Sequence, residues 1–203
     1  MVRAAQLGAV RRPAWGVIQM PRDTLIQTLL QLVKAIILCT DHKLQLPALM
    51  LLYAGVDISG WLASPDQQST RASFTDWVDK YLLPSKPLPC TALELYAARC
   101  GLLHTYTAES NLASAGKARQ IAYAWGDAQA RDLQKTIDLE GRTDLVALHV
   151  SDLLEGFRLG LSAYFADLDS KPSLAATFEA KASKSFAPAS KDLIRDYLDR
   201  YDS

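Results

Sequence analysis

The chain has 203 residues, of which 49% are hydrophobic and 22% are charged. This length and composition are typical of one globular domain with a sizeable core, and they exclude a disordered or fibrous protein. Lysine plus arginine and aspartate plus glutamate both total 22, so the formal net charge is zero. A neutral chain lacks the broad basic surface that coats nucleic acid, so any contact with nucleic acid must be local.

The cysteines and the apolar segments indicate the cellular compartment of the protein. Cys39, Cys90 and Cys100 are widely spaced and odd in number, which argues against a disulfide framework or a zinc knuckle and favours a reducing compartment. The most apolar segments, residues 25–39 and 46–54, are interrupted by Gln, Lys or Pro before they reach the roughly 20 residues that a membrane span needs. We therefore expect a soluble, cytoplasmic protein with no membrane partner.

The first residues differ from the rest of the chain. Residues 1–20 carry three arginines, no acidic residue and no apolar block long enough for a signal peptide. We expect residues 1–20 to be a disordered or non-native leader, with a functional basic arm as the alternative. Residues 21–203 are then expected to form a single, mainly helical domain.

The first half of that domain has the periodicity of helices. From Asp23, apolar residues recur at spacings of three and four, which predicts an amphipathic helix that ends near Asp41. Pro47 fits the first turn of a second, almost entirely apolar helix that contains a single acid, Asp57. A third, short helix is expected over FTDWVDKYLL, with Ser73 as its cap.

A fourth helix has the clearest start signal. Thr91 and Glu94 have the spacing of a capping box, T-x-x-E. The helix is expected to run through RCGLLHTY, residues 99–106, to about Glu109. These helices make residues 21–110 a motif-bearing bundle.

Residues 111–203 are expected to extend the bundle. Residues 117–126, KARQIAYAWG, alternate large apolar residues with alanines, which is typical of a short strand or hairpin arm. Apolar residues near helical spacing then predict one long helix over residues 143–169. The predicted fold class is therefore mainly α, a HEPN-like helical bundle in the sense given below, with a possible short β-strand or hairpin around 117–126.

RCGLLHTY places an arginine, a histidine and a tyrosine in the fourth helix. On a regular α-helix, Arg99 and Tyr106 lie within about 20° of each other, whereas His104 is about 140° round from Arg99. Such a pair can still converge on a groove along the helix, particularly where a second copy contributes its own pair. Gly101 lies between them and permits a close helix contact or a local bend.

The chemistry of this pair suits RNA cleavage without a metal. An imidazole can take a proton from a ribose 2′-hydroxyl and return one to the leaving oxygen. A guanidinium offers a forked, permanently charged partner for the phosphate and for the charge that develops on it. The sequence has neither metal-ligand spacing nor a glycine-rich phosphate loop, so no cofactor is expected. The alternative is that Arg99 is an ion-pair partner and Tyr106 a core residue.

HEPN-domain proteins have the motif R-x4-H-x-Y, and Arg99, His104 and Tyr106 match it position for position. The chain resembles in particular the HEPN toxins of two-gene systems whose partner is a nucleotidyltransferase. The resemblance implies a helical homodimer with both motifs at a shared cleft, and a metal-independent ribonuclease of phage defence or growth control. In some members of the family the nucleotidyltransferase adenylylates the motif tyrosine and thereby silences the toxin, and the resemblance implies that Tyr106 is that position.

The resemblance covers residues 23–110, and its specific part is RCGLLHTY. Cys100 stands where a polar residue commonly follows the motif arginine, and the chain after residue 110 is not part of the minimal HEPN fold. Some HEPN-like proteins are inactive and serve as dimerisation or nucleotide-binding modules. A catalytically inactive helical dimerisation, nucleotide-binding or interaction module is therefore the alternative function, and it predicts that Arg99 forms a structural salt bridge.

Asp57 lies alone in a very apolar helix, where an unpaired carboxylate is costly. Its expected partner is Arg99 or His104, with the acid holding the guanidinium or orienting the imidazole. The alternative is that Asp57 points to water at a helix bend. The predicted site thus has Arg99 and His104 as catalytic residues, and Tyr106 and Asp57 as substrate-binding or modification positions.

Three further residues have a weaker chemical signal. We interpret His149 as a packed or solvated histidine rather than a second base. Lys117 and Arg119 form a small basic pair that could touch a phosphate backbone, although such residues are more often only solvated.

Overall fold

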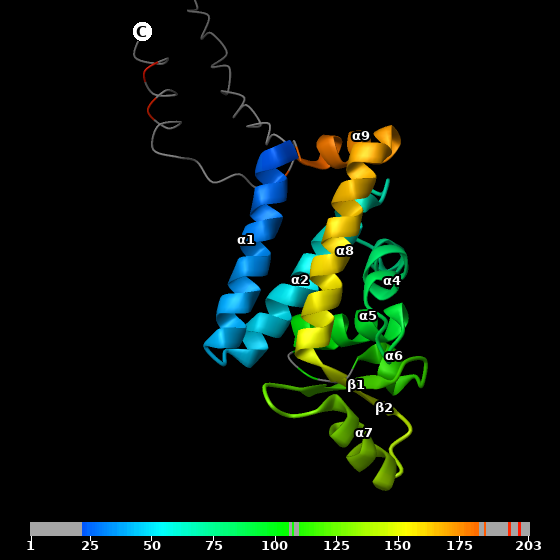
Figure 1. Cartoon of the computed structure of the whole chain (residues 1–203). Helices are drawn as coiled ribbons and strands as arrows, with labels where there is room; N and C mark the ends of the chain where they lie inside the picture. Colours follow the sequence, from blue (N-terminus) through cyan, green and yellow to red (C-terminus); the bar gives the residue numbers. More distant parts are fainter. Residues whose placement is uncertain are drawn as a thin grey trace, which may run out of the picture.

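The computed structural model of the chain describes residues 22–105, 107, 110–182, 185, 195 and 199, and for residues 104 and 105 it describes the backbone only. The expected leader, residues 1–20, and most of the chain after residue 182 lie outside this description. Figure 1 shows a mainly helical structure with one small sheet at one end, as the fold class predicted. The division into a leader and a single domain stays a prediction.

Two long helices form a hairpin at the start of the described chain. α1 (Arg22–Asp41) and α2 (Gln45–Ala63) confirm the first two predicted helices. α1 buries a single stripe of side chains at helical spacing: Leu25, Leu29, Val33 and Ile36. α2 buries residues on most of its circumference and contacts α1, α3, α8 and α9, so it is the central helix of the bundle.

Both helices of the hairpin are long and apolar enough to cross a membrane by length and composition alone. The expectation that polar residues break these segments too early for a span is therefore wrong. The core helix of a soluble protein passes the same test, and 50% of the apolar window of α2 is buried in the bundle against 22% for α1. The absence of a membrane partner stays a prediction.

The third helix begins earlier than predicted. α3 (Arg71–Trp77) is capped by Thr70 rather than by Ser73, because Ser73 occupies the third helical position of a capping box. The Ser73 amide donates to Thr70 Oγ1 at 3.1 Å, and the Thr70 amide donates to Ser73 Oγ at 2.9 Å. The helix continues as a π-helical segment, η1 (Val78–Leu82), and a short α4 (Leu83–Ser85).

The fourth helix starts as predicted but changes its geometry in the motif. In α5 (Ala92–Cys100), the Glu94 amide donates to Thr91 Oγ1 at 3.2 Å and the Thr91 amide donates to Glu94 Oε2 at 2.8 Å, which confirms the capping box. The α-helix ends at Cys100, and a π-helical segment, η2 (Gly101–Thr105), follows it. Ser110 then caps a short α6 (Asn111–Ser114).

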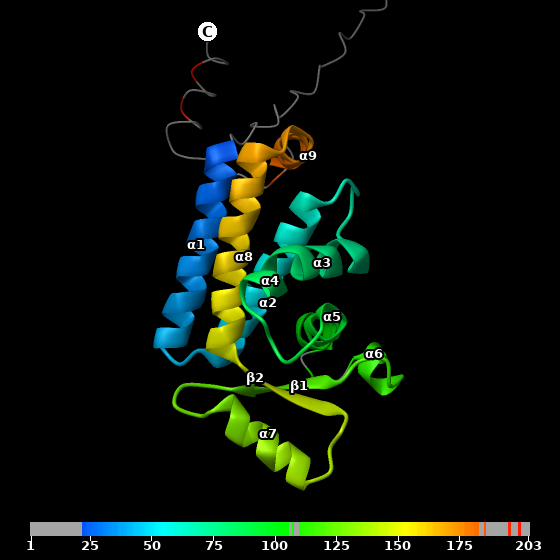
Figure 2. The ribbon, with the colours of Figure 1, turned by 45° about the vertical axis from the view of Figure 1, so that its right-hand side comes forward.

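A parallel two-stranded sheet closes one end of the bundle. β1 (Gln120–Ala124) confirms the predicted strand, and it pairs with β2 (Leu145–His149) in parallel. The hairpin alternative is wrong, since parallel strands need a crossover, and α7 (Ala130–Leu139) provides it. α7 covers the outer face of the sheet, while α5 and α8 contact it from the bundle side (Figure 2).

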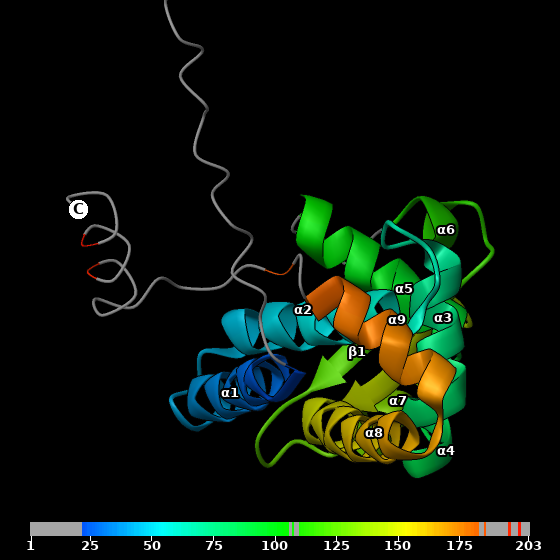
Figure 3. The same ribbon diagram turned by 90° about the horizontal axis from the view of Figure 1, so that it is seen from above.

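The long helix predicted over residues 143–169 is wrong at its start. α8 (Val150–Ser170) begins only at Val150, and the preceding residues form β2. The sequence LVALH is a short apolar run, and periodicity alone does not distinguish a buried strand from a helix in such a run. α9 (Pro172–Ala182) then crosses the end of the bundle above α2 and α8 (Figure 3).

Lys181 fastens α9 to the carboxyl end of α2. Its side chain is 5% exposed, and its ammonium donates to the backbone carbonyl of Trp61 and, at 2.5 Å, to that of Ser64. The ammonium also lies 4.9 Å from the centroid of the Trp61 ring. A cation at this end donates hydrogen bonds to carbonyls of the last turn and interacts favourably with the helix dipole.

Replacing Lys181 by Met should destabilise the fold. The substitution removes the ammonium from the Ser64 carbonyl and leaves the Trp61 carbonyl only its bond from the Ser64 amide at 3.2 Å. A buried acceptor without a partner costs about 1–3 kcal/mol. We expect the free energy of unfolding in urea to fall by about that amount. Lys34→Met, on the exposed side of α1, is the matched control and should change stability by less than about 0.5 kcal/mol. Equal stability of the two variants would contradict a capping role for Lys181.

Candidate functional site

The structure brings two of the predicted site residues together. Arg99, in the last turn of α5, donates from Nη2 to Asp57 Oδ2 on α2 at 2.7 Å. The two side chains are only 16% and 17% exposed. This confirms that Asp57 is paired and identifies Arg99 as its partner, so the alternative in which Asp57 points to water is wrong.

Ser69, in the loop before α3, is a second hydrogen-bond partner of Asp57. Ser69 Oγ donates to Asp57 Oδ1 at 2.9 Å, so both carboxylate oxygens accept a hydrogen bond. Gly60 permits this arrangement, because a Cβ at that position would lie 2.6 Å from the carbonyl oxygen of Ser73. The close approach of α2 to the start of α3 brings the preceding loop within reach of Asp57.

The surroundings of Arg99 keep it charged. Burial alone would lower the pKa of Arg99, but the hydrogen bond and the negative charge of Asp57 raise it above its ordinary value. Cys100 interacts with Arg99 and with Tyr96, and burial together with the hydrogen bond to Cys100 raises the pKa of the Tyr96 phenol. A thiol and a neutral phenol therefore flank the guanidinium.

A shallow groove of about 350 Å³ opens beside the ion pair. Its lining consists of Asp57, Ile58, Trp61, Gln67, Gln68 and Ser69. Ile58 is 40% exposed, and the Trp61 indole donates from Nε1 to the carbonyl of Gln67 at 3.1 Å. The groove therefore combines an apolar, aromatic wall with amides and a hydroxyl, and it presents the carboxylate of the ion pair rather than the guanidinium.

The π-helical segment η2 changes the geometry of the motif. A π-helix bonds residue i to i+5, so each of its residues advances by less than the roughly 100° of an α-helix. Position 104 consequently comes closer to the face of position 99 than the 140° or so that a regular helix gives. The Thr107 amide donates to the Gly101 carbonyl at 3.2 Å and closes the segment. The side chain of His104 and all of Tyr106 lie outside the described residues.

A second ion pair holds the sheet to the start of α5. Arg119 donates from Nε to Glu94 Oε1 at 2.6 Å and from Nη2 to Glu94 Oε2 at 3.1 Å. Glu94 also serves the capping box, and its side chain is only 8% exposed. Burial alone would raise the pKa of Glu94, but the bonds from Arg119 and from the Thr91 amide lower it below its ordinary value. Arg119 therefore forms a structural ion pair with Glu94.

His149 lies where β2 meets α8 and caps that helix. Its Nδ1 accepts from the Ser151 amide at 3.2 Å, which leaves Nε2 to donate to the Gly126 carbonyl at 3.2 Å. The Ser151 hydroxyl lies 2.6 Å from the same Nδ1. These contacts join the carboxyl ends of the two strands and support the interpretation of His149 as a structural residue.

Some polar contacts had no signal in the sequence. Tyr53 on α2 and Tyr123 on β1 share a hydrogen bond of 2.5 Å between their hydroxyl oxygens. Burial is the main reason why the pKa of both phenols is raised above its ordinary value. Burial also raises the pKa of the nearby Cys90 thiol to about 12. Ser69 and Tyr96 were likewise missed, because their roles depend on the packing of distant elements.

No family model, curated protein or solved structure matches this chain. The expected likeness to HEPN-domain proteins therefore stays a prediction from the sequence motif RCGLLHTY.

Asp57 and Arg99 should be strongly coupled in stability. Asp57→Asn leaves a partly buried guanidinium without its counter-charge, and we expect a loss of about 1–3 kcal/mol. Arg99→Gln should cost a similar amount, and the double variant should cost less than the sum of the two. Urea unfolding of all three variants measures the coupling, with Asp76→Asn on the exposed side of α3 as a control. A coupling energy near zero would show that the pair is not held in solution.

The pair between Glu94 and Arg119 should make stability depend on pH. The pKa of Glu94 is lowered in the folded state, so its contribution is fully present above the unfolded value of about 4.3 and is lost as the pH falls through the folded value. Glu94→Gln should therefore be less stable than the wild type at about pH 7, and the difference should shrink toward about pH 3. Urea unfolding across this range measures it, with the exposed Glu179→Gln as the control. A difference that persists unchanged at acidic pH would refute the assignment.

Proposed function

We propose that this protein is a metal-independent endoribonuclease of the HEPN type, acting as a cytoplasmic homodimer in growth control or phage defence. The observation that carries the proposal is the sequence motif of Arg99, His104 and Tyr106, whose arginine lies in the last turn of a capped helix and is held by Asp57. In this role Arg99 binds the scissile phosphate, His104 transfers protons and Asp57 positions Arg99.

The proposed reaction is an attack by the ribose 2′-oxygen on the adjacent phosphorus. An imidazole takes the proton of the 2′-hydroxyl as the O2′–P bond forms, and an imidazolium gives a proton to the 5′-oxygen as the P–O5′ bond breaks. The attacking and leaving oxygens lie on opposite sides of the phosphorus, which suits a cleft shared by two copies of the motif. The products are a 2′,3′-cyclic phosphate and a 5′-hydroxyl, and neither redox chemistry nor a further reactant is required.

The geometry around Arg99 supports the phosphate-binding role. A guanidinium carries five N–H donors in a planar fork, so one residue can hold a carboxylate on one edge and a phosphate on another. The pair with Asp57 orients this fork before substrate binds, which reduces the entropy lost on binding. The groove lined by Ile58 and Trp61 offers an aromatic surface beside the pair for an RNA base.

The proposed partner protein is a nucleotidyltransferase antitoxin. It would adenylylate the hydroxyl of Tyr106, two residues after His104, and so place a bulky, negatively charged group beside the proposed phosphate site. This negative charge would repel an RNA phosphate and silence the enzyme.

RNA cleavage in EDTA tests the enzymatic proposal. The purified protein should cleave total RNA with EDTA present, and His104→Ala should reduce the rate by at least about 100-fold, as expected for loss of a general acid–base group. Arg99→Lys keeps the charge but loses the fork, and it should also impair cleavage. His42→Ala, in the turn between α1 and α2, is the matched control and should retain full activity. Equal cleavage by His104→Ala and wild type, or none by the wild type, would eliminate the proposal.

An inactive helical interaction module is the second candidate, and one observation favours it. Arg99 is 16% exposed and bonded to Asp57, and it is the carboxylate that lines the adjacent groove. This is the salt bridge that a structural role for the motif predicts. In that case wild type, His104→Ala and Arg99→Lys should all fail to cleave RNA, while Asp57→Asn still lowers stability.

A further inference from the structure

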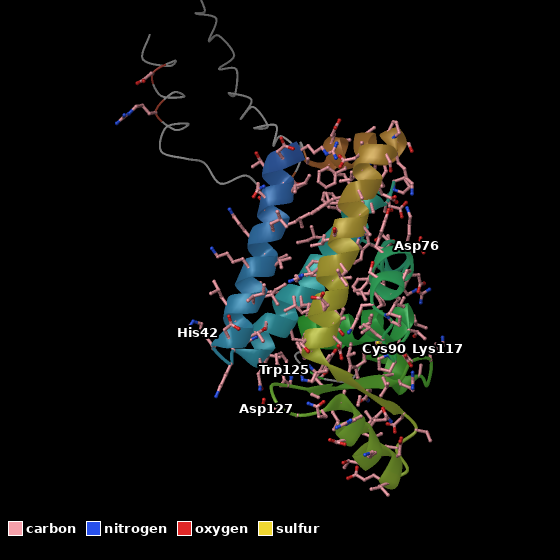
Figure 4. All side chains as sticks on the ribbon, viewed as in Figure 1. His42, Asp76, Cys90, Lys117, Trp125 and Asp127 are labelled. Atoms are coloured by element: carbon pink, nitrogen blue, oxygen red, sulfur yellow. The ribbon has the colours of Figure 1, made fainter. Side chains whose placement is uncertain are left out.

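A polar pocket lies at the amino ends of the two strands, outside the motif. Its volume is about 290 Å³. It is formed by the turn after α6, by the start of β1 and by the residues before β2, with Glu94 at its base: the lining residues used below are Gly116, Lys117, Ala118, Arg119, Gln120 and Thr143. Figure 4 shows Lys117 at the edge of the molecule beside α5 and α6, on the same side as Cys90.

The acidic side chains of this pocket are already neutralised. Glu94 receives two hydrogen bonds from Arg119, at 2.6 and 3.1 Å. Asp144 at the rim receives two from Arg142, at 2.8 and 2.7 Å. Both carboxylates of the lining are therefore paired with a guanidinium, and Arg142 also interacts with the charge of Glu140. The ammonium of Lys117 is the cation of the lining that forms no ion pair within the described residues.

The remaining polar groups of the pocket are available to a ligand. Within the described part of the chain, no carboxylate forms an ion pair with Lys117, and the side chains of Gln120 and Thr143 make no hydrogen bond. Lys117, Gln120 and Thr143 therefore line one cavity, and each has a polar side-chain group that can donate a hydrogen bond. Phosphate oxygens accept hydrogen bonds from ammonium and hydroxyl groups, and an ammonium that forms no ion pair favours an anion over a neutral ligand.

The geometry points to a phosphate-binding site in this pocket, with Lys117 as the charged ligand and Thr143 and Gln120 as further hydrogen-bond donors. The chemical class of the ligand is a phosphate group, carried either by a nucleotide or by the backbone of RNA. The site does not depend on the proposed ribonuclease, because none of its residues belongs to the motif and binding requires no cleavage.

Nuclear magnetic resonance titration of the full chain tests the site and separates the two sources. The probes are inorganic phosphate, adenosine 5′-monophosphate, adenosine and a short RNA, each added at constant ionic strength. The first two should shift the amide signals of Gly116 and Ala118, whereas adenosine should leave them unchanged. If RNA shifts them at lower concentration than the nucleotide, the backbone is the source of the phosphate; if the nucleotide is tighter, a small molecule is the source.

Two variants make the test specific. Lys117→Gln should weaken binding of the phosphate probes roughly tenfold, because a charge-assisted hydrogen bond is lost. Thr143→Val, of nearly the same shape, should weaken it less. Lys34→Gln makes the same charge change on α1, far from the pocket, and should leave binding unaltered. The proposal is overturned if no phosphate probe shifts these signals, if adenosine shifts them equally, or if Lys34→Gln and Lys117→Gln weaken binding to the same extent.

Discussion

The partly buried ion pair between Arg99 and Asp57 connects the motif helix to the centre of the bundle. α5 packs chiefly on α3 and β1, and this pair is its charged link to α2. Each partner depends on the other, because a carboxylate or a guanidinium that is about five-sixths buried is unfavourable when it is left alone. The position of Arg99, and with it any chemistry of the motif, therefore follows from a carboxylate that lies 42 residues earlier.

The opposite end of α5 is fixed by a different arrangement. Glu94 caps the helix and at the same time binds Arg119 at the start of β1, so one carboxylate joins a local signal to a long-range contact. The same contact removes the negative charge from the polar pocket beside Lys117. The helix thus has an anchored arginine at one end and the polar pocket of Lys117 beside the other.

The sequence allowed the helices with a strong periodicity or a complete cap to be predicted. α1, α2 and the capping box of Thr91 and Glu94 are examples, because their signals lie within a few adjacent residues. β2 was predicted as helix, because the apolar residues of LVALH fit the helical spacing of the segment that follows. Its identity as a strand depends on β1, which lies 25 residues away. The cap of α3 was misplaced since Thr70 and Ser73 can both accept a hydrogen bond, and only the path of the loop decides between them.

The candidate site was predictable only in part, for the same reason. The cost of an unpaired Asp57 in an apolar helix pointed to a partner, and Arg99 was one of two choices. The contact from Ser69 and the groove with Trp61 depend on how closely the loop before α3 approaches α2 at Gly60, which no local pattern encodes. The π-helical turn after Cys100 was also unexpected, although Gly101 had indicated a local irregularity.

The central claim is that Arg99 and His104 promote cleavage of RNA by the 2′-hydroxyl group of the RNA itself. The most direct measurement is the mass of the fragments released from one defined RNA in EDTA, beside the same RNA with 2′-O-methyl groups throughout. The account predicts fragments that end in a 2′,3′-cyclic phosphate and begin with a 5′-hydroxyl, and no cleavage of the methylated strand. Fragments with 5′-phosphates, or cleavage of both strands, would contradict it.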